Sequence, residues 1–390
     1  MRESTVALLG AAAVLVAGAI DPASALAALA VQWNVFLFFL GLMSIAAIAD
    51  QSGLLEDLVE AAAGAARGRA DVLFLLVCAV ALIVTVTLTN DATVLLLTPL
   101  VVDMAARLRL PVLPYAYACA LLANAGSVAL PIANPANVLV LRTVPIGASE
   151  FIALLATSAA CASLATIVVV FLRRRVELAQ PITMPIPNQR DAGAGAVAIG
   201  VALIVCAYLF ALELRWPVGI VAVCGAGALI TLQSARGFLR VDALRRDIAW
   251  GIFPLLAGLV IVVHAAEGAG LVDVAVRLLA DRSADPSGII TLSLASAALA
   301  NLMNNLPWAL LASSAAQHLP SFDPRLAASL LVGIDVGPNF TTFGSLATLL
   351  WIVLLRRRGI EVTSLAYARA AFLPSAAALG AAILPLLFYR

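Results

Sequence analysis

The sequence predicts an all-α, polytopic membrane protein that consists of two inverted repeats. Three observations indicate this fold class. The 390 residues are 63% hydrophobic and only 12% charged, whereas a soluble domain carries roughly a quarter charged residues. Apolar windows long enough to cross about 30 Å of hydrocarbon follow one another along the chain. A set of polar residues within the first half recurs at matching places in the second half, which is typical of internal repeats.

Two kinds of apolar segment account for most of the chain. Nine windows are predicted to cross the membrane: residues 5–20, 31–49, 114–140, 150–172, 194–211, 217–232, 250–266, 325–355 and 364–388. Two further stretches, 71–104 and 286–317, are interrupted at their middles by Asn90-Asp91 and Asn304-Asn305. Polar, irregular backbone is tolerated at membrane depth only where protein or a water-filled cavity surrounds it. We therefore expect two re-entrant helical hairpins; two ordinary spans on either side of a chance polar pair are the alternative.

The repeat defines the predicted domains. Phe39-Leu-Gly-Leu-Met43 recurs 217 residues later as Leu256-Ala-Gly-Leu-Val260, and the Gly- and Pro-broken stretch 124–137 recurs as 335–348. We predict a first repeat over 1–172, a linker with one helix over 173–216, and a second repeat over 217–390. Each repeat has four crossings and one hairpin, so the lone helix 194–211 inverts the second copy.

Arginines orient the chain, which contains no lysine. If both hairpins return to the side from which they enter, most arginines lie on one face and a minority on the other. The larger group includes Arg67, Arg107, Arg174, Arg246 and Arg357, and the smaller group includes Arg142 and Arg215. The positive-inside rule assigns the larger group to the cytoplasm. We therefore expect a multi-pass protein of the inner (plasma) membrane with a cytoplasmic N-terminus.

Polar side chains concentrate at the two hairpin tips and in the two broken helices. Gly and Pro stop a helix there and free backbone groups for ligands, and the pseudo-twofold symmetry brings these places toward the midplane. The candidate substrate-binding residues are Thr89, Asn90, Thr93, Asn134, Asn137, Asn304, Asn305, Thr342 and Ser345. Because neither motif contains arginine or lysine, these amides and hydroxyls suit a small uncharged polyhydroxyl or a partly hydrated ion better than a dianion.

Two carboxylates, Asp91 and Asp335, are the exceptions among these neutral groups. An ionisable residue inside a membrane is costly and is by default a functional hypothesis. Asp91 is matched by Asn305 and Asp335 by Asn124, so each repeat supplies one carboxylate at a different position. Burial disfavours the charge of an unpaired carboxyl, which suits coupling to protons or sodium. Alternatively, helix N-termini neutralise one or both of these groups, which then serve only to shape the site. Asp50 and Glu267 match each other at predicted helix ends, where we expect solvated boundary residues.

Other chemistries find little support in the sequence. The five cysteines form no C-x-x-C pair, and His264 and His318 have no neighbouring carboxylate or second histidine along the predicted elements, so we expect neither a metal nor a cofactor. No phosphate-binding loop is present; transport should therefore draw on a gradient or on a separate cytoplasmic ATPase subunit. We do not expect an enzyme: a membrane-embedded hydrolase would need a nucleophile and a base, and no membrane histidine completes the only near pairing, Ser345 with Asp335. We expect no nucleic-acid partner.

The second broken helix carries the most specific signature. Gly333-Ile-Asp-Val-Gly-Pro-Asn-Phe-Thr-Thr-Phe-Gly-Ser-Leu-Ala-Thr-Leu-Leu-Trp351 resembles the second-repeat signature of the bacterial arsenite efflux permeases, the arsenical pump membrane proteins. Leu88-Thr-Asn-Asp-Ala-Thr-Val-Leu-Leu-Leu-Thr-Pro99 is similar to their first hairpin. The resemblance runs from about residue 33 to the end. It implies the fold of the ion transporter superfamily, with a scaffold domain that often forms a homodimer and a transport domain that moves.

The resemblance also implies an activity. These permeases export trivalent arsenite and antimonite, as neutral trihydroxides, in exchange for protons. They commonly have a basic residue where Asn339 stands in this sequence. The alternative is a sodium/proton antiporter or a sodium-coupled anion transporter of the same fold, since such relatives coordinate sodium at the place of Thr89-Asn90-Asp91. Sodium-dependent uptake would distinguish the two functions.

Overall fold

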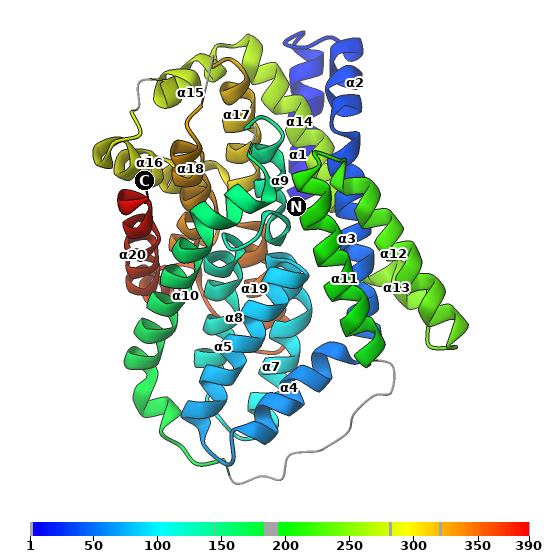
Figure 1. The fold of residues 1–390 in the computed structure, drawn as a ribbon, viewed down its shortest axis with the longest axis vertical. Coiled ribbons are helices and arrows are strands. Elements are labelled where there is room, and N and C mark those ends of the chain that lie inside the picture. Colours follow the sequence, from blue (N-terminus) through cyan, green and yellow to red (C-terminus); the bar gives the residue numbers. More distant parts are fainter. Residues whose placement is uncertain (1–2, 145, 183–193, 281–282, 320–321, 390) are drawn as a thin grey trace.

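The structure, a computed structural model, describes residues 3–144, 146–182, 194–280, 283–319 and 322–389, and it confirms the predicted all-α membrane fold (Figure 1). The described residues form helices and connecting turns, with one isolated β-bridge between Arg69 and Pro181. Eight described helices are long and apolar enough to cross a membrane. The apolar residues thus lie mainly in long helices, which satisfy their backbone hydrogen bonds internally, as a membrane-spanning segment must.

The first repeat begins with four helices, α1 (Glu3–Val16), α2 (Pro22–Val31), α3 (Trp33–Gln51) and α4 (Leu54–Ala65). The first hairpin follows as α5 (Ala70–Thr87), α6 (Asn90–Ala92), the π-helix η1 (Thr93–Leu97) and α7 (Thr98–Arg107). The first discontinuous helix comprises α8 (Val112–Ser127), η2 (Pro131–Ala133) and α9 (Pro135–Leu141), and α10 (Ala148–Leu178) completes the repeat.

Helix α11 (Ala194–Glu213) precedes the second repeat, which runs through the same order of elements. Its first part is α12 (Val218–Ala235), α13 (Val241–Asp247), α14 (Ile252–Gly268) and α15 (Leu271–Ala280). The second hairpin is α16 (Pro286–Met303) with α17 (Asn305–Gln317). The second discontinuous helix comprises α18 (Pro324–Val336), η3 (Gly337–Phe340) and α19 (Leu346–Arg357), and α20 (Ser364–Phe388) ends the chain.

The first helix of each repeat packs against a helix of the other repeat. Helix α3 packs along α12, and its counterpart α14 packs along α1. Both contacts depend on equivalent glycines. A Cβ atom on Gly41 would lie 2.3 Å from the carbonyl carbon of Ala222, and a Cβ atom on Gly258 would lie 2.6 Å from that of Ala7. Close approach of backbones across small residues is a usual means of helix packing in membranes.

The hairpins lie at opposite ends of the molecule, as inverted repeats require. In Figure 1, α4, α5 and α7 occupy the lower half, whereas α15, α16 and α17 occupy the upper half. Each hairpin packs against the discontinuous helix of its own repeat, α5 against α8 and α16 against α18. Here too a glycine permits the approach, since a Cβ atom on Gly337 would lie 2.5 Å from the Cα atom of Ala297.

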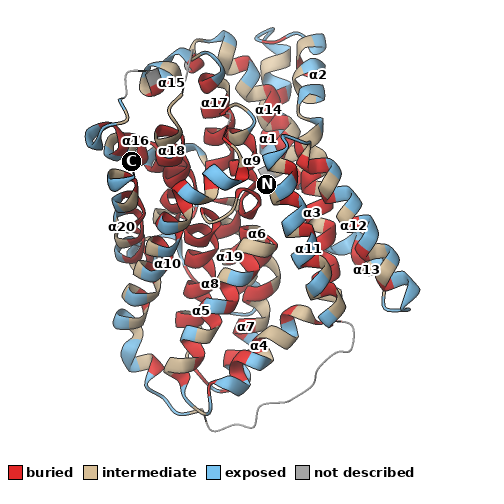
Figure 2. Ribbon diagram, in the orientation of Figure 1, coloured by how far each residue is buried: buried red, intermediate tan, exposed pale blue. Residues whose placement is uncertain are grey.

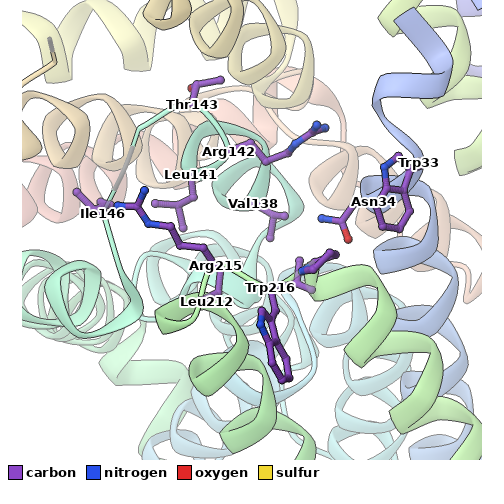
Figure 3. A pocket seen from close by; sticks show the side chains of 12 residues that line it. Trp33, Asn34, Val138, Leu141, Arg142, Thr143, Ile146, Leu212, Arg215 and Trp216 are labelled. Atoms are coloured by element: carbon purple, nitrogen blue, oxygen red, sulfur yellow. The ribbon is translucent and has the colours of Figure 1, made fainter. Parts of the chain in front are cut away.

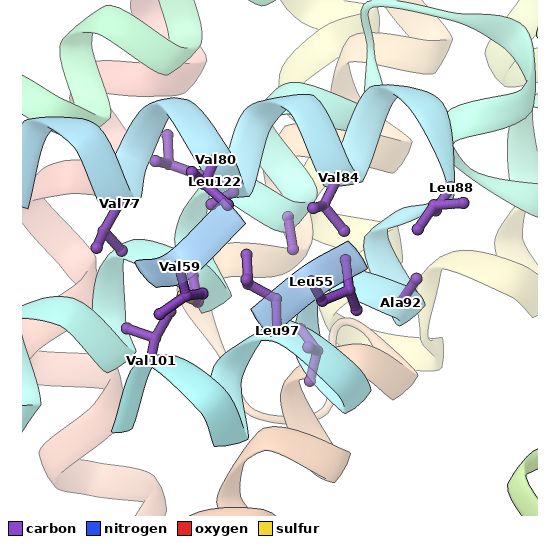
Figure 4. Packing of buried hydrophobic residues seen from close by; sticks show 14 of the residues in the cluster. Leu55, Val59, Val77, Val80, Val84, Leu88, Ala92, Leu97, Val101 and Leu122 are labelled. Carbon is purple, nitrogen blue, oxygen red and sulfur yellow. The ribbon is translucent and has the colours of Figure 1, made fainter. Parts of the chain in front are cut away.

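The buried side chains form two large clusters, one around each hairpin. In the first, Leu55, Val77, Val84, Leu97 and Val101 interdigitate between α4, α5 and the hairpin's return arm (Figure 4). Figure 2 shows that burial is densest where hairpins and discontinuous helices meet, and that the peripheral helices expose much of their surface. The exposed residues there include Leu203 and Phe210 on α11. Such an apolar exterior suits a lipid environment.

Three details differ from the sequence prediction. The window 5–20 ends as a helix at Val16, and residues 22–31 form a separate short helix. The amphipathic helices α4 and α15 were not predicted; each has one apolar face and too few apolar residues to register as a span. Helix α10 continues to Leu178, so the first residues assigned to the linker are helical. Residues 183–193 of that linker lie outside the described part of the chain.

Candidate functional site

The two hairpin tips and the two helix breaks meet at a small cavity, here called the central chamber. It measures about 20 Å³, which is room for roughly one water molecule. Its lining residues are Phe39, Asn90, Asp91, Asn134, Pro135, Ile252, Asn305, Leu306, Ser345 and Leu346. Each of the four predicted polar regions thus contributes a side chain, and α3 and α14 supply the apolar wall. None of these lining residues, all within the described chain, is cationic.

A larger cavity of about 660 Å³, here called the vestibule, adjoins the chamber. Phe39, Asp91, Pro135, Ile252 and Leu346 line both cavities. From there the vestibule extends to its mouth at Arg246, Asp247 and Arg357, on the face predicted to be cytoplasmic. The vestibule therefore connects the chamber to the end of the molecule that carries these charged residues.

Equivalent N-caps build the two helix breaks. Asn134 precedes α9 with φ −138° and ψ 128°, and its Oδ1 accepts a hydrogen bond from Ala136 N at 3.0 Å. Ser345 precedes α19 with φ −139° and ψ 141°, and its Oγ accepts from Ala347 N at 3.2 Å. Both side chains use one oxygen to start a half-helix and also face the chamber. The sequence repeat therefore reproduces a local geometry as well as a polar residue.

The hairpin tips also begin their return arms with caps. Thr89 Oγ1 accepts a hydrogen bond from Ala92 N at 3.2 Å. Asn304 has a positive φ of 78° with ψ 151°, accepts from Leu306 N at 3.3 Å, and donates through Nδ2 to Phe343 O at 2.9 Å. Asparagine tolerates positive φ better than most residues. These caps turn Asn90 and Asn305 into the chamber, and Asn305 N also donates to Gly344 O at 2.9 Å.

A buried polar network lies behind the chamber, between α8, α9 and α18. Asp335 is fully buried, and its Oδ1 accepts a hydrogen bond from Asn134 Nδ2 at 2.7 Å. Asn124 donates through Nδ2 to Asn339 Oδ1 at 2.9 Å, and Asn339 Nδ2 donates to Leu121 O at 2.9 Å. Asn137 Nδ2 donates to Ser127 O at 3.1 Å. The network joins the two repeats through their discontinuous helices.

Three oxygens of this network have no hydrogen-bond donor among the described residues: Asp335 Oδ2, Asn124 Oδ1 and Asn137 Oδ1. Leaving a buried acceptor unpaired costs about 1–3 kcal/mol, and more for a charged group. The side chains of Ser127 and Asn137 interact with the Asp335 carboxylate, yet they donate nothing to Oδ2. The cluster therefore contains more hydrogen-bond acceptors than donors, and a proton or a cation would satisfy the surplus.

Asp91 occupies a different environment. It lies at the tip of the first hairpin, lines both the chamber and the vestibule, and is partly exposed to the latter. Its backbone N–H donates to Asn90 Oδ1 at 2.9 Å. No described residue donates a hydrogen bond to its carboxylate. Of the two predicted carboxylates, Asp91 contacts the vestibule, and Asp335 lies buried behind Asn134.

The structure separates the predicted site residues into two groups. Asn90, Asp91, Asn134, Asn305 and Ser345 line the chamber. Thr89 lines the vestibule and caps the return arm. The others lie around the chamber and make structural bonds or belong to the buried network: Thr93, Asn137, Asn304, Thr342 and Asp335. Thr93 hydrogen-bonds Thr85 at 2.7 Å inside the first hairpin, and Thr342 donates to Ser364 at 3.2 Å.

Asn301 was missed by the sequence analysis. Its Nδ2 donates to Gly337 O at 2.7 Å, and its Oδ1 accepts from Thr341 at 2.8 Å, which ties the second hairpin to the second break. An asparagine one helical turn before a polar pair, inside an apolar window, was the available signal. The apolar chamber residues Phe39 and Ile252 gave no comparable signal.

The expectations for Glu267 and His264 need correction. Glu267 accepts a hydrogen bond from Ser314 Oγ on α17 and pairs with His264 Nδ1 at 2.6 Å. His264 therefore does have a carboxylate neighbour, one turn further along the same helix. Glu267 is only partly exposed and connects α14 to the second hairpin, so it is more than a solvated boundary residue.

Comparison with known proteins places these features in a family. The chain is 26% identical to the arsenical pump membrane protein of Escherichia coli (strain K12) over 378 residues, which cover 92% of this chain and 86% of that protein. It is 25% identical to the arsenical pump membrane protein of Yersinia enterocolitica, covering 85% and 81%. An uncharacterized transporter of Mycobacterium tuberculosis (strain H37Rv) is 26% identical, covering 93% and 88%.

Among solved structures, the fold is similar to that of the Alcanivorax borkumensis YdaH transporter. The TM-score is 0.60 at 14% identity, and the match covers 93% of this chain and 86% of that one. Residues 1–333 match the family described as citrate transporter, CitMHS. With its membrane spans and its central chamber, the chain is therefore a membrane transporter that belongs to the citrate transporter (CitMHS) family.

Proposed function

We propose that the protein exports arsenite and antimonite across the inner membrane, as neutral trihydroxides, in exchange for protons. The observation that carries this proposal is the lining of the central chamber. Its polar groups are the amides of Asn90, Asn134 and Asn305 and the hydroxyl of Ser345, with one carboxylate, Asp91. Amides and hydroxyls both donate and accept hydrogen bonds, as the hydroxyl groups of a trihydroxide do. A neutral substrate needs no compensating cation there.

The size and charge of the chamber favour a small neutral substrate over an organic anion. A chamber of about 20 Å³ admits roughly a water-sized group, and the adjoining vestibule offers the remaining space. A tricarboxylate would be desolvated there without a cationic partner, which is strongly unfavourable. The arginines of the vestibule, Arg246 and Arg357, stand at its mouth.

The two carboxylates provide the proposed route for protons. Asp91 contacts the vestibule and can exchange protons with the aqueous phase on that side. Asp335 is connected to the chamber through Asn134, which donates to its Oδ1. A proton on Oδ2 of Asp335 would remove an uncompensated buried charge and turn an unpaired acceptor into a donor toward the neighbouring amide oxygens. Substrate binding at Asn134 and protonation of Asp335 therefore affect each other.

The proposed transport cycle moves the chamber relative to the helices that wall it. The hairpin tips and the discontinuous helices carry the polar side chains, whereas α3 and α14 supply Phe39 and Ile252. We propose an elevator-like or rocking displacement of the first group past the second, which would expose the chamber to the opposite side. The names of the related arsenical pump membrane proteins support the substrate assignment.

Arsenite uptake by everted membrane vesicles tests this function. The vesicles come from a host that lacks its own arsenite exporters, and the gradient is imposed with the lumen acidic. Uptake that depends on the chain and collapses with a protonophore, in sodium-free buffer, is the expected result. Uptake of citrate instead of arsenite, or uptake that requires sodium and ignores the pH gradient, would replace the proposed activity by the alternative of a sodium-coupled anion transporter.

A further inference from the structure

A third cavity, of about 360 Å³, lies at the opposite end of α3 from the vestibule mouth and has no role in the proposed transport cycle. It is here called the interfacial pocket. Trp33 and Asn34 at the start of α3, Arg142 after α9, and Arg215 and Trp216 between α11 and α12 lie around it (Figure 3). The far end of α3 approaches the vestibule mouth, where Gln51 donates to Asp247. The two cavities therefore open at opposite faces.

The interfacial pocket lies at the depth of lipid headgroups. Three candidate spans begin or end at it: α3 at Trp33, α11 at Glu213 and α12 at Val218. Trp33 and Trp216 are 46% and 61% exposed. Tryptophan is enriched where membrane helices reach the boundary between hydrocarbon and water. A ligand of this pocket would therefore meet the bilayer surface directly.

The polar lining of the pocket is basic. Its described lining residues include Arg142 and Arg215 and no carboxylate. Arg142 is oriented by two hydrogen bonds, from Nη1 to Gln32 Oε1 and from Nη2 to Val31 O at 3.0 Å. A guanidinium group carries five N–H donors, so Arg142 retains donors beyond these two. Arginine forks match the oxygens of a phosphate group. Both arginines belong to the face predicted to be poor in basic residues.

The wall of the pocket is also partly apolar, because Leu141, Ile146 and Leu212 belong to it. Exposed apolar side chains lie on the adjoining elements as well: Phe210 on α11, Leu214 just after it, and Ile220 on α12. A free phosphate would use only the arginines, whereas a phospholipid would also cover these apolar side chains with its acyl chains. We infer that the interfacial pocket binds the phosphodiester headgroup of an anionic phospholipid.

Occupancy of the pocket would affect the transport site. The pocket joins α9, whose N-cap Asn134 lines the chamber, to α3, which contributes the chamber residue Phe39. A bound lipid that contacts Arg142 and Trp33 together would hold these two elements in one arrangement. This consequence concerns regulation and does not depend on which substrate the chamber carries.

Native mass spectrometry and thermal unfolding of the purified protein test the lipid site. The probes are phosphatidylglycerol, phosphatidylcholine and inorganic phosphate, added to detergent micelles. We expect phosphatidylglycerol to be retained and to raise the melting temperature, with no effect of phosphatidylcholine or phosphate. The double substitution Arg142→Gln and Arg215→Gln should weaken phosphatidylglycerol binding at least tenfold. The matched control Arg277→Gln, an exposed arginine on α15 outside the pocket, should bind as the wild type does.

Three results would overturn the inference: equal retention of phosphatidylglycerol by the double variant, equal stabilisation by phosphatidylcholine, or full stabilisation by phosphate alone, which would assign a free anion instead. If the double variant does not fold, tryptophan quenching in protein that keeps both arginines provides a second test. Brominated phosphatidylglycerol should quench tryptophan fluorescence more than brominated phosphatidylcholine. The excess quenching should disappear in Trp33→Phe, Trp216→Phe protein; its persistence there would refute the site.

Discussion

Replacing Asp335 by asparagine should separate coupling from folding. The variant amide keeps the shape of the carboxylate, so its oxygen can still accept the hydrogen bond that Asn134 Nδ2 now gives at 2.7 Å. Its new N–H groups replace the unpaired Oδ2, and the neighbouring Asn137 carries an unpaired amide oxygen that could accept from them. One gained hydrogen bond is worth about 1 kcal/mol. The variant should therefore unfold in detergent at a temperature no lower than that of the wild type.

The transport consequence can be calculated from the gradient. A difference of one pH unit supplies about 1.36 kcal/mol per proton, which corresponds to about tenfold accumulation of a neutral substrate for each proton exchanged. With the membrane potential held at zero, wild-type vesicles should therefore accumulate arsenite up to about tenfold for each proton exchanged when the lumen is one unit more acidic. Asp335→Asn vesicles should only equilibrate arsenite, while counterflow between labelled and unlabelled arsenite continues.

A matched carboxylate controls for the loss of charge. Asp103 lies on the surface in an ion pair with Arg358 at 2.9 Å, remote from the chamber lining, and Asp103→Asn should accumulate arsenite as the wild type does. Gradient-driven accumulation by Asp335→Asn protein at normal expression would refute the role of Asp335 in coupling. Loss of counterflow together with accumulation would instead assign Asp335 to substrate binding.

Three further outcomes follow from the geometry. Asn305→Ala should raise the half-saturating arsenite concentration about fivefold, as expected for one lost hydrogen bond of about 1 kcal/mol, and unchanged saturation kinetics would place the substrate elsewhere. Gly41→Leu should lower the free energy of unfolding by about 1–3 kcal/mol or more, measured by thermal denaturation. Gly227→Leu is the control and should not, because no atom lies within 4 Å of an added Cβ there. Equal melting temperatures of the two variants would contradict the close packing of α3 on α12. The double variant Glu267→Cys, Ser314→Cys, made in a background without native cysteines, can form a disulfide between α14 and the second hairpin. Transport should stop when the disulfide forms and return when it is reduced. Full activity of the cross-linked protein would exclude sliding of the second hairpin past α14.

The sequence was sufficient to predict most of the architecture. Membrane spans follow from apolar windows, and the hairpin tips at Asn90 and Asn304 follow from polar pairs that interrupt such windows, because the hydrocarbon interior penalises unpaired polar groups. The repeat also predicted that Asn134 and Ser345 occupy equivalent positions, and both cap a half-helix at the chamber.

Sequence reasoning could not predict which polar side chains face the chamber. That choice depends on the rotation of each helix and on partners distant in the chain. Thr93 begins a π-helical turn that directs its hydroxyl to Thr85, and no sequence signal marks this turn. The hydrogen bond between Asn134 and Asp335 joins residues 201 positions apart in different repeats. The pair of His264 and Glu267, by contrast, has a spacing of three and was available from helix periodicity.

The most direct test of the account measures proton movement driven by arsenite. Purified protein is reconstituted into liposomes that contain a pH-sensitive dye, in sodium-free buffer without an imposed gradient. A neutral trihydroxide carries no charge and few dissociable protons at neutral pH, so a change in lumenal pH reports exchange. Arsenite added outside should raise the lumenal pH in a saturable manner, as protons leave in exchange for substrate. Arsenite entry without a change in lumenal pH would contradict arsenite/proton exchange.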